Sequence, residues 1–191
     1  MQYNLILTSD EFERCKKFSE ESAKTQREHR SGGTQIRGLN QIEEDTQRGK
    51  VGEVIALKFL RQSPLNITEV KLDFDIYPRG KWDEQDFTLH GKRIAVKSAK
   101  WFSRWLLIET KDLGRGDVYD YYILVVIAKD FKSGEIKGYA TKDEILNGKA
   151  MMKLKKGEKI PNTNTALDAD NNAIHSKDLH NSDEEWLSLI K

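Results

Sequence analysis

The sequence predicts an α/β domain in which a central mixed β-sheet is flanked by helices. Segments with strand-like and helix-like patterns are mixed along the chain, which is typical of this class. The run 121–127 is almost continuously apolar, as expected of a central strand that is covered on both faces. The stretch 86–97 alternates apolar and polar residues on either side of His90-Gly91, which predicts a β-hairpin.

Two helices are expected in the first third of the chain. Thr8 and Glu11 have capping-box spacing, which predicts a helix over residues 9–30 that ends near the glycines at 32 and 33. A second helical pattern covers roughly 43–61, and Ser63-Pro64 stops it.

The remaining expected elements are strands and one short helix. Strand patterns occur at 67–72, 74–77, 104–109, 121–128 and 136–140. A second capping box, Thr141 with Glu144, predicts a short helix that ends by Gly148. Beyond it, the C-terminal region 149–191 is polar and weakly periodic.

Length and composition favour one domain over 1–191, with a core at about 45–145. The chain has no apolar run long enough to span a bilayer, and its first residues lack the basic and apolar regions of a signal peptide. We therefore expect a cytoplasmic protein. Cys15 is the only cysteine, which excludes an internal disulfide and a cysteine-rich zinc site.

Charge is distributed unevenly, although the net charge is only +1. Residues 79–104 contain seven basic and three acidic residues, a net charge of +4, whereas 165–191 contain two basic and six acidic residues, a net charge of −4. A basic segment around the hairpin is what a phosphate-binding cleft requires. The alternative is a solvated, charged hairpin.

The hairpin brings an acid and an amine together. With a two-residue turn at His90-Gly91, Asp86 lies opposite Ala95, and Lys97 lies two residues further along the same face. An acid and an amine on a rigid sheet can bind a metal ion and polarise a phosphate. The alternative is an ordinary surface pair of Asp86 with Lys97, which contributes little.

The order of these residues resembles the PD-(D/E)XK nuclease superfamily over residues 45–145. A helix carries Glu53 just after Gly49 and Gly52, Asp86 follows, and Lys97 completes the hairpin. The two glycines are expected to let another backbone approach the start of this helix closely. The resemblance implies a restriction-endonuclease-like fold and a catalytic site of Glu53, Asp86 and Lys97. It also implies that Asp86 and Glu53 bind Mg²⁺ or Mn²⁺. The alternative interpretation of Glu53 alone is a solvated glutamate on the helix surface.

One position departs from the family pattern. The family has Glu or Asp two residues before the lysine, and this chain has Ala95. Three interpretations are open: an engineered inactivation, a natural chain in which another acid such as Asp83 or Glu84 substitutes, or a domain that binds without cutting. We favour the first, and we expect Ala95 to lie on a polar, partly open face that would accept a glutamate.

Further basic and aromatic residues are candidates for nucleic-acid contact. The proposed binding residues are Arg93, Lys100 and Arg104 after the motif, and Arg27, Arg30 and Arg37 near a glycine-containing loop. Trp101, Phe102 and Trp105 are interleaved with cations, which suits base stacking. We favour a buried cluster for these aromatics, because tryptophan is usually largely buried.

Together these features predict a metal-dependent DNA endonuclease. Cutting both strands with one site per chain would require two chains, so we expect a homodimer on DNA. The competing hypothesis is a non-catalytic nucleic-acid-binding or protein-interaction module on the same fold. An RNA-directed enzyme is a third option.

Overall fold

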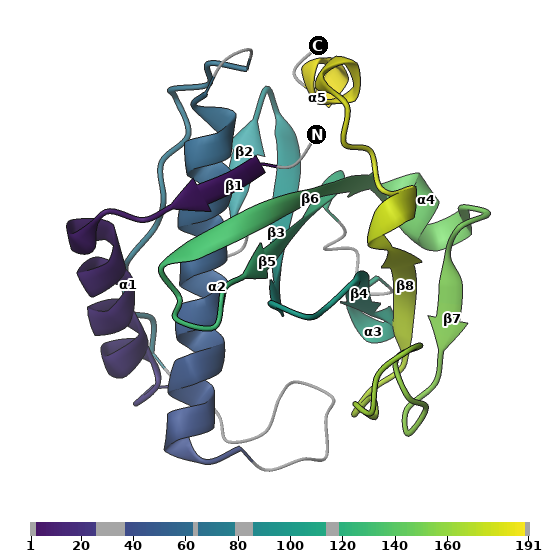
Figure 1. Cartoon of the computed structure of the whole chain (residues 1–191), viewed down its shortest axis with the longest axis horizontal. Helices are drawn as coiled ribbons and strands as arrows, with labels where there is room; N and C mark the ends of the chain where they lie inside the picture. The colour runs from purple at the N-terminus through teal and green to yellow at the C-terminus, as the bar shows by residue number, and fades with distance from the viewer. Residues whose placement is uncertain (1–2, 26–36, 63–64, 79–85, 114–118, 190–191) are drawn as a thin grey trace.

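A computed structural model describes residues 3–25, 37–62, 65–78, 86–113 and 119–189. Five strands form a curled mixed sheet in the order β1-β6-β5-β3-β2 (Figure 1). Their bounds are Tyr3–Ile6 for β1, Phe87–Leu89 for β2, Lys92–Lys100 for β3, Tyr121–Ile127 for β5 and Ser133–Thr141 for β6. β3 and β5 run parallel, and the other pairs are antiparallel. The predicted α/β class and mixed sheet are confirmed.

The helix α2 (Leu39–Leu60) crosses one face of this sheet and contacts four of its strands. The helix α1 (Ser9–Ser22) packs against α2 on the outside (Figure 1). Between α2 and the sheet lies a first core, which includes Ile55, Phe59, Ile94 and Ile123. The capping box predicted at Thr8 is confirmed at the start of α1.

A second, three-stranded sheet lies on the other side of the main sheet. It has the order β4-β8-β7, with bounds Trp105–Glu109, Asn171–His175 and Met152–Leu154 respectively. The second core, which includes Leu106, Leu124 and Ile174, lies between the two sheets. β5 is therefore buried on both faces, as predicted.

Short helices complete the described structure: α3 (Thr110–Leu113), α4 (Lys142–Asn147), the 3₁₀ turn η1 (Ser176–Asp178) and α5 (Asp183–Leu189). The capping box predicted at Thr141 opens α4. The polar C-terminal region 149–191 is part of the fold: β8 pairs with β4, and Trp186 of α5 is buried against Phe59. No helix of the described residues is long and apolar enough to cross a membrane.

The hairpin of β2 and β3 has the predicted register. Phe87 lies opposite Ile94, and the turn residues His90 and Gly91 both have positive φ, 47° and 75°. This is the backbone of a two-residue turn whose twist matches that of the strands. Glycine adopts it without steric cost.

Two predictions were wrong. The helix α1 ends at Ser22, whose carbonyl accepts hydrogen bonds from the backbone N–H and the hydroxyl of Thr25. Residues 26–30 lie outside the described part. The segment 65–78 forms no strand, although Ile67 and Val70 are buried in the first core. Its alternation reflects packing rather than strand pairing, and the side chain of Arg61 donates a hydrogen bond to the carbonyl of Val70.

Close packing at Gly52 seats α2 against β3. A Cβ at Gly52 would lie 1.8 Å from Ser98 Oγ and 3.0 Å from Ser98 Cβ, whereas a Cβ at Gly49 would meet nothing within 4 Å. Of the two glycines, Gly52 alone is needed for a close approach, and what approaches it is a side chain rather than another backbone. Both glycines lie in the middle of α2 rather than at its start.

We expect Gly52→Ala to lower the stability of the fold and Gly49→Ala to raise it. Alanine gains about 1 kcal/mol in an open helix position, but overpacking at Gly52 costs about 1–3 kcal/mol. Urea denaturation of both variants checks this. Adding Ser98→Ala should recover part of the loss in Gly52→Ala; a loss unaffected by Ser98→Ala would mean that Ser98 does not set the packing.

An ionic cluster around His180 joins α4, α5 and β6. His180 Nε2 lies 2.7 Å from Glu144 Oε1, and its Nδ1 lies 2.7 Å from Glu185 Oε1. Partial burial opposes the charge of His180, but the hydrogen bonds to Glu185 and Glu144 outweigh it and raise the pKa of His180 above 6.5. Backbone hydrogen bonding at Ser182 and the bond to His180 lower the pKa of Glu185 to about 2. The pKa of Glu144 is also lowered, because its hydrogen bonds outweigh burial.

This cluster predicts a pH-dependent contribution to stability. The carboxylates of Glu144 and Glu185 stabilise the fold above their ordinary pKa of 4.5, and this stabilisation is lost as pH falls through their lowered pKa values. His180 stabilises the fold below pH 6.5, and its stabilisation is lost as pH rises through its raised pKa. His180→Gln should therefore lower Tm most between about pH 4.5 and 6.5, by a few degrees, about 1 kcal/mol after solvent screening. Thermal unfolding from pH 3 to 9 measures it. His175→Gln is the control, and a pH-independent loss in His180→Gln would contradict the prediction.

Candidate functional site

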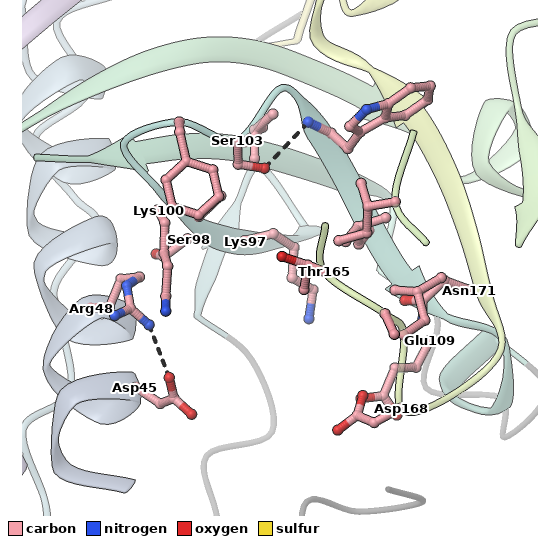
Figure 2. Close-up of a pocket in the computed structure, with 18 of the residues that line it drawn as sticks. Asp45, Arg48, Lys97, Ser98, Lys100, Ser103, Glu109, Thr165, Asp168 and Asn171 are labelled. Carbon is pink, nitrogen blue, oxygen red and sulfur yellow. Dashed lines mark hydrogen bonds and ion pairs between the residues drawn. The ribbon is translucent and has the colours of Figure 1, made fainter. Parts of the chain in front are cut away.

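A cleft of about 640 Å³ opens between α2, the end of β3 and the second sheet. Gln41, Asp45 and Arg48 of α2 line one side, and Trp105, Leu107 and Glu109 of β4 line the other. The segment 160–171 closes the cleft with Asp168 and Asn171 (Figure 2). The second sheet is what makes this concave surface, so the wall formed by residues 160–171 was not expected from the sequence.

The lining combines charged side chains with apolar ones such as Phe102, Leu107 and Ile160. Four cations, Arg37, Arg48, Lys97 and Lys100, face three acids, Asp45, Glu109 and Asp168. Asp45 accepts hydrogen bonds from Arg37 at 3.2 Å and Arg48 at 2.9 Å, and Glu109 pairs with Lys111 at 2.6 Å. Two of the three acids are therefore already held by cations.

Lys97 and Lys100 are the cations that remain available in the cleft. They form no ion pair with any other described residue. Figure 2 shows the Lys100 side chain extending beside Arg48, whereas the Lys97 side chain points into the middle of the cleft near Thr165. A lysine ammonium is a compact point charge suited to a phosphate oxygen. This side of the cleft can therefore bind an anion.

Asp86 sits at the other strand of the hairpin. The backbone N–H of Val96 donates a 2.6 Å hydrogen bond to Asp86 Oδ2. This bond holds the carboxylate beside β3 at Val96, the residue between Ala95 and Lys97. Asp86 is not among the residues that line the cleft, whereas Lys97 is.

Glu53 is engaged elsewhere on α2. Lys50 Nζ lies 2.5 Å from Glu53 Oε2 and donates a second hydrogen bond to the carbonyl of Asp73 at 2.7 Å. The ammonium lies 4.6 Å from the centre of the Phe18 ring. Burial raises the pKa of the Cys15 thiol on α1 to about 12, and the charges of Lys50 and Glu53 act on it in opposite directions. Glu53 and Lys50 thus form a largely buried pair near α1, and Glu53 is not among the residues that line the cleft.

Ala95 lies in the second core. It is 1% exposed and belongs to the same apolar cluster as Leu106, Tyr122 and Leu124. The expectation of a polar, partly open face at this position was wrong, because the second sheet covers it. Further along the same face Lys97 and Ala99 reach the cleft.

The residues described here do not complete a metal site. No group of three or more His, Cys, Asp or Glu side chains that could hold a metal ion occurs among them. Glu53 would first have to leave Lys50, and Ala95 carries no ligand atom. The substitutes considered from the sequence, Asp83 and Glu84, lie outside the described residues.

The basic residues predicted to bind nucleic acid do not form one patch. Arg37 and Lys100 line the cleft, and Arg104 is exposed on the turn after β3. Arg93 lies seven residues before Lys100, about 23 Å along an extended strand, with its guanidinium over the ring of Tyr119. Arg27 and Arg30 lie outside the described residues.

The aromatic residues after the motif divide into two environments. Trp105 is buried, as expected, and its ring N–H donates to the carbonyl of Pro161 at 3.3 Å. Trp101 and Phe102 are exposed, at 57% and 44%, so the expectation of one buried cluster was wrong for both. The β3–β4 turn carries them outward.

The charged cleft-lining residues that the sequence analysis did not single out are Asp45, Arg48, Glu109 and Asp168. Asp168 had been counted only as part of the acidic C-terminal region, and Arg48 lies one helical turn before Gly52. Helical spacing places Asp45 and Arg48 as neighbours, which was the one available signal. Comparisons of the chain with family models, with curated proteins and with solved structures find no match.

We expect Ala95→Glu to destabilise the protein by about 2–4 kcal/mol, because a carboxylate would be buried among apolar side chains. Ala99→Glu is a matched control on the same strand and face, since Ala99 lines the open cleft. Chemical denaturation of both variants measures the difference. Equal stability of the two variants would mean that the Ala95 position opens to solvent more readily than its packing indicates.

Proposed function

We propose that this chain is a metal-dependent DNA endonuclease of the PD-(D/E)XK type. The observation that supports it best is the hairpin. It holds Asp86 against β3, and Lys97, two residues after Ala95, lines a cleft with cations on one side. The resemblance of the motif residues is consistent with this arrangement. The proposal takes Ala95 as a natural residue of the second core rather than as the engineered inactivation favoured from the sequence.

Within the proposal, Lys97 and Lys100 contact the DNA backbone. Their ammonium groups would neutralise phosphate oxygens, and Lys97 would stabilise charge that develops during cleavage. The expected ion is Mg²⁺ or Mn²⁺, which would activate water, and Asp86 is its expected ligand. Double-strand cutting would involve a homodimer on DNA.

A second candidate is a nucleic-acid-binding module on the same fold that does not cut. The observation that favours it is the pair of Lys50 with Glu53, since a carboxylate held at 2.5 Å by an ammonium is already satisfied. The close packing around Ala95 points the same way, because it suits an alanine that belongs to the core.

Cleavage of supercoiled plasmid in Mg²⁺ or Mn²⁺ tests the proposal. Asp86→Asn and Lys97→Ala should each reduce cleavage at least a hundredfold, since removal of one electrostatic catalyst has about this effect. Lys129→Ala, on the exposed β5–β6 turn, is the matched control and should cut normally.

DNA binding separates the two candidates. The affinity for DNA should fall steeply as the salt concentration rises. Lys97→Ala should reduce the slope of log affinity against log salt concentration by about 1, the release of about one counterion. Binding without cleavage, on plasmids of many different sequences, would support the binding module. A chain that neither binds nor cleaves DNA would contradict both the nuclease and the binding module.

A further inference from the structure

The turn between β3 and β4 carries two large aromatic side chains into solvent. The N–H of Ser103 donates to the carbonyl of Lys100 at 2.8 Å, which closes the turn over Trp101 and Phe102. Among the described tryptophans, Trp105 and Trp186 are buried, and Trp101 is 57% exposed. Neighbouring exposed aromatics mark a binding surface more often than a scattered apolar residue does.

The two rings contact each other edge to face rather than stacking on one another. Their centres lie 5.4 Å apart at an angle of 89°, an edge-to-face contact. In this geometry the ring that contributes its edge keeps both faces clear of the other ring. Trp101 is the more exposed of the two rings, so a planar group from solvent can reach it.

The charge around the turn indicates what that planar group is attached to. From Lys97 to Ile108 the chain contains three cations, with Lys100 and Arg104 flanking the aromatics, and no acid. Lys100 and Phe102 also line the cleft that contains Lys97. Exposed aromatic rings between cations, next to the side of the cleft that carries Lys97, match a nucleic-acid strand, whose bases stack while its phosphates contact the cations.

We propose that the turn 100–104 is a stacking platform for an unpaired DNA base at the mouth of the cleft. Trp101 stacks on the base, Phe102 supports it, and Lys100 and Arg104 contact the adjoining phosphates. The preferred ligand is DNA with a single-stranded or bulged position, because paired bases expose no face to a side chain. The choice of DNA rests on the proposed function; the stacking itself rests on the turn.

Fluorescence anisotropy with labelled oligonucleotides in EDTA tests the platform. The chain should bind a single strand and a bulged duplex more tightly than the fully paired duplex. Trp101→Ala and Phe102→Ala should weaken binding to the first two about tenfold and change the paired duplex less than twofold. Trp101→Phe should retain most of the preference.

Met152→Ala is the matched control. Met152 lies on β7 and is 44% exposed, as Phe102 is, and its variant should bind all three DNAs normally. Circular dichroism of each variant checks that the fold is intact. Equal losses on paired and unpaired DNA, or no loss, would overturn the platform.

The outcomes also separate the platform from the proposed nuclease. Cleavage that depends on Asp86 and Lys97, with an unchanged DNA preference in Trp101→Ala, overturns the platform alone. A preference for unpaired DNA that depends on Trp101, without cleavage by the chain, overturns the nuclease alone. A change in oligomeric state in Trp101→Ala, with unchanged DNA binding, would assign the turn to protein contact instead.

Discussion

The packing of α2 against β3 at Gly52 and Ser98 is the constraint on which the rest of the structure depends. It brings the helix close enough to close the first core over the sheet. Arg48 lies one turn before Gly52, and Lys97 adjoins Ser98, so the same contact sets how far apart their side chains stand in the cleft. If α2 and β3 were further apart, Arg48 and Lys97 would be too far apart to contact the same ligand.

β3 changes character along each of its faces. On the face toward α2, Ile94 and Val96 pack in the first core before Ser98 meets the helix. On the opposite face, Ala95 is sealed under the second sheet, and Lys97 emerges where that cover ends. One strand thus serves two cores and a charged cleft, which explains why a motif read along the strand does not show which of its residues meet solvent.

The sequence predicted what depends on neighbouring residues. The hairpin register, both capping boxes and the doubly covered strand β5 follow from local alternation and turn chemistry. What failed depends on distant segments: the irregular path of 65–78 is stabilised by side chains of α2 and Arg61. Ala95 is covered by a sheet whose β7 and β8 strands lie more than fifty residues away. The exposure of Trp101 depends on where the turn leaves the sheet, which composition does not encode.

The pairing of β4 with β8 has a consequence for biosynthesis. Trp105 pairs with His175, about 70 residues later, so a ribosome that adds about 5–20 residues per second leaves β4 without its partner for several seconds. During that interval a mostly apolar strand, with Leu106 and Ile108 at its centre, presents unsatisfied backbone groups that can pair with another nascent chain. The cleft wall is completed only when residues 160–175 have emerged, and until then productive folding competes with aggregation or relies on a chaperone.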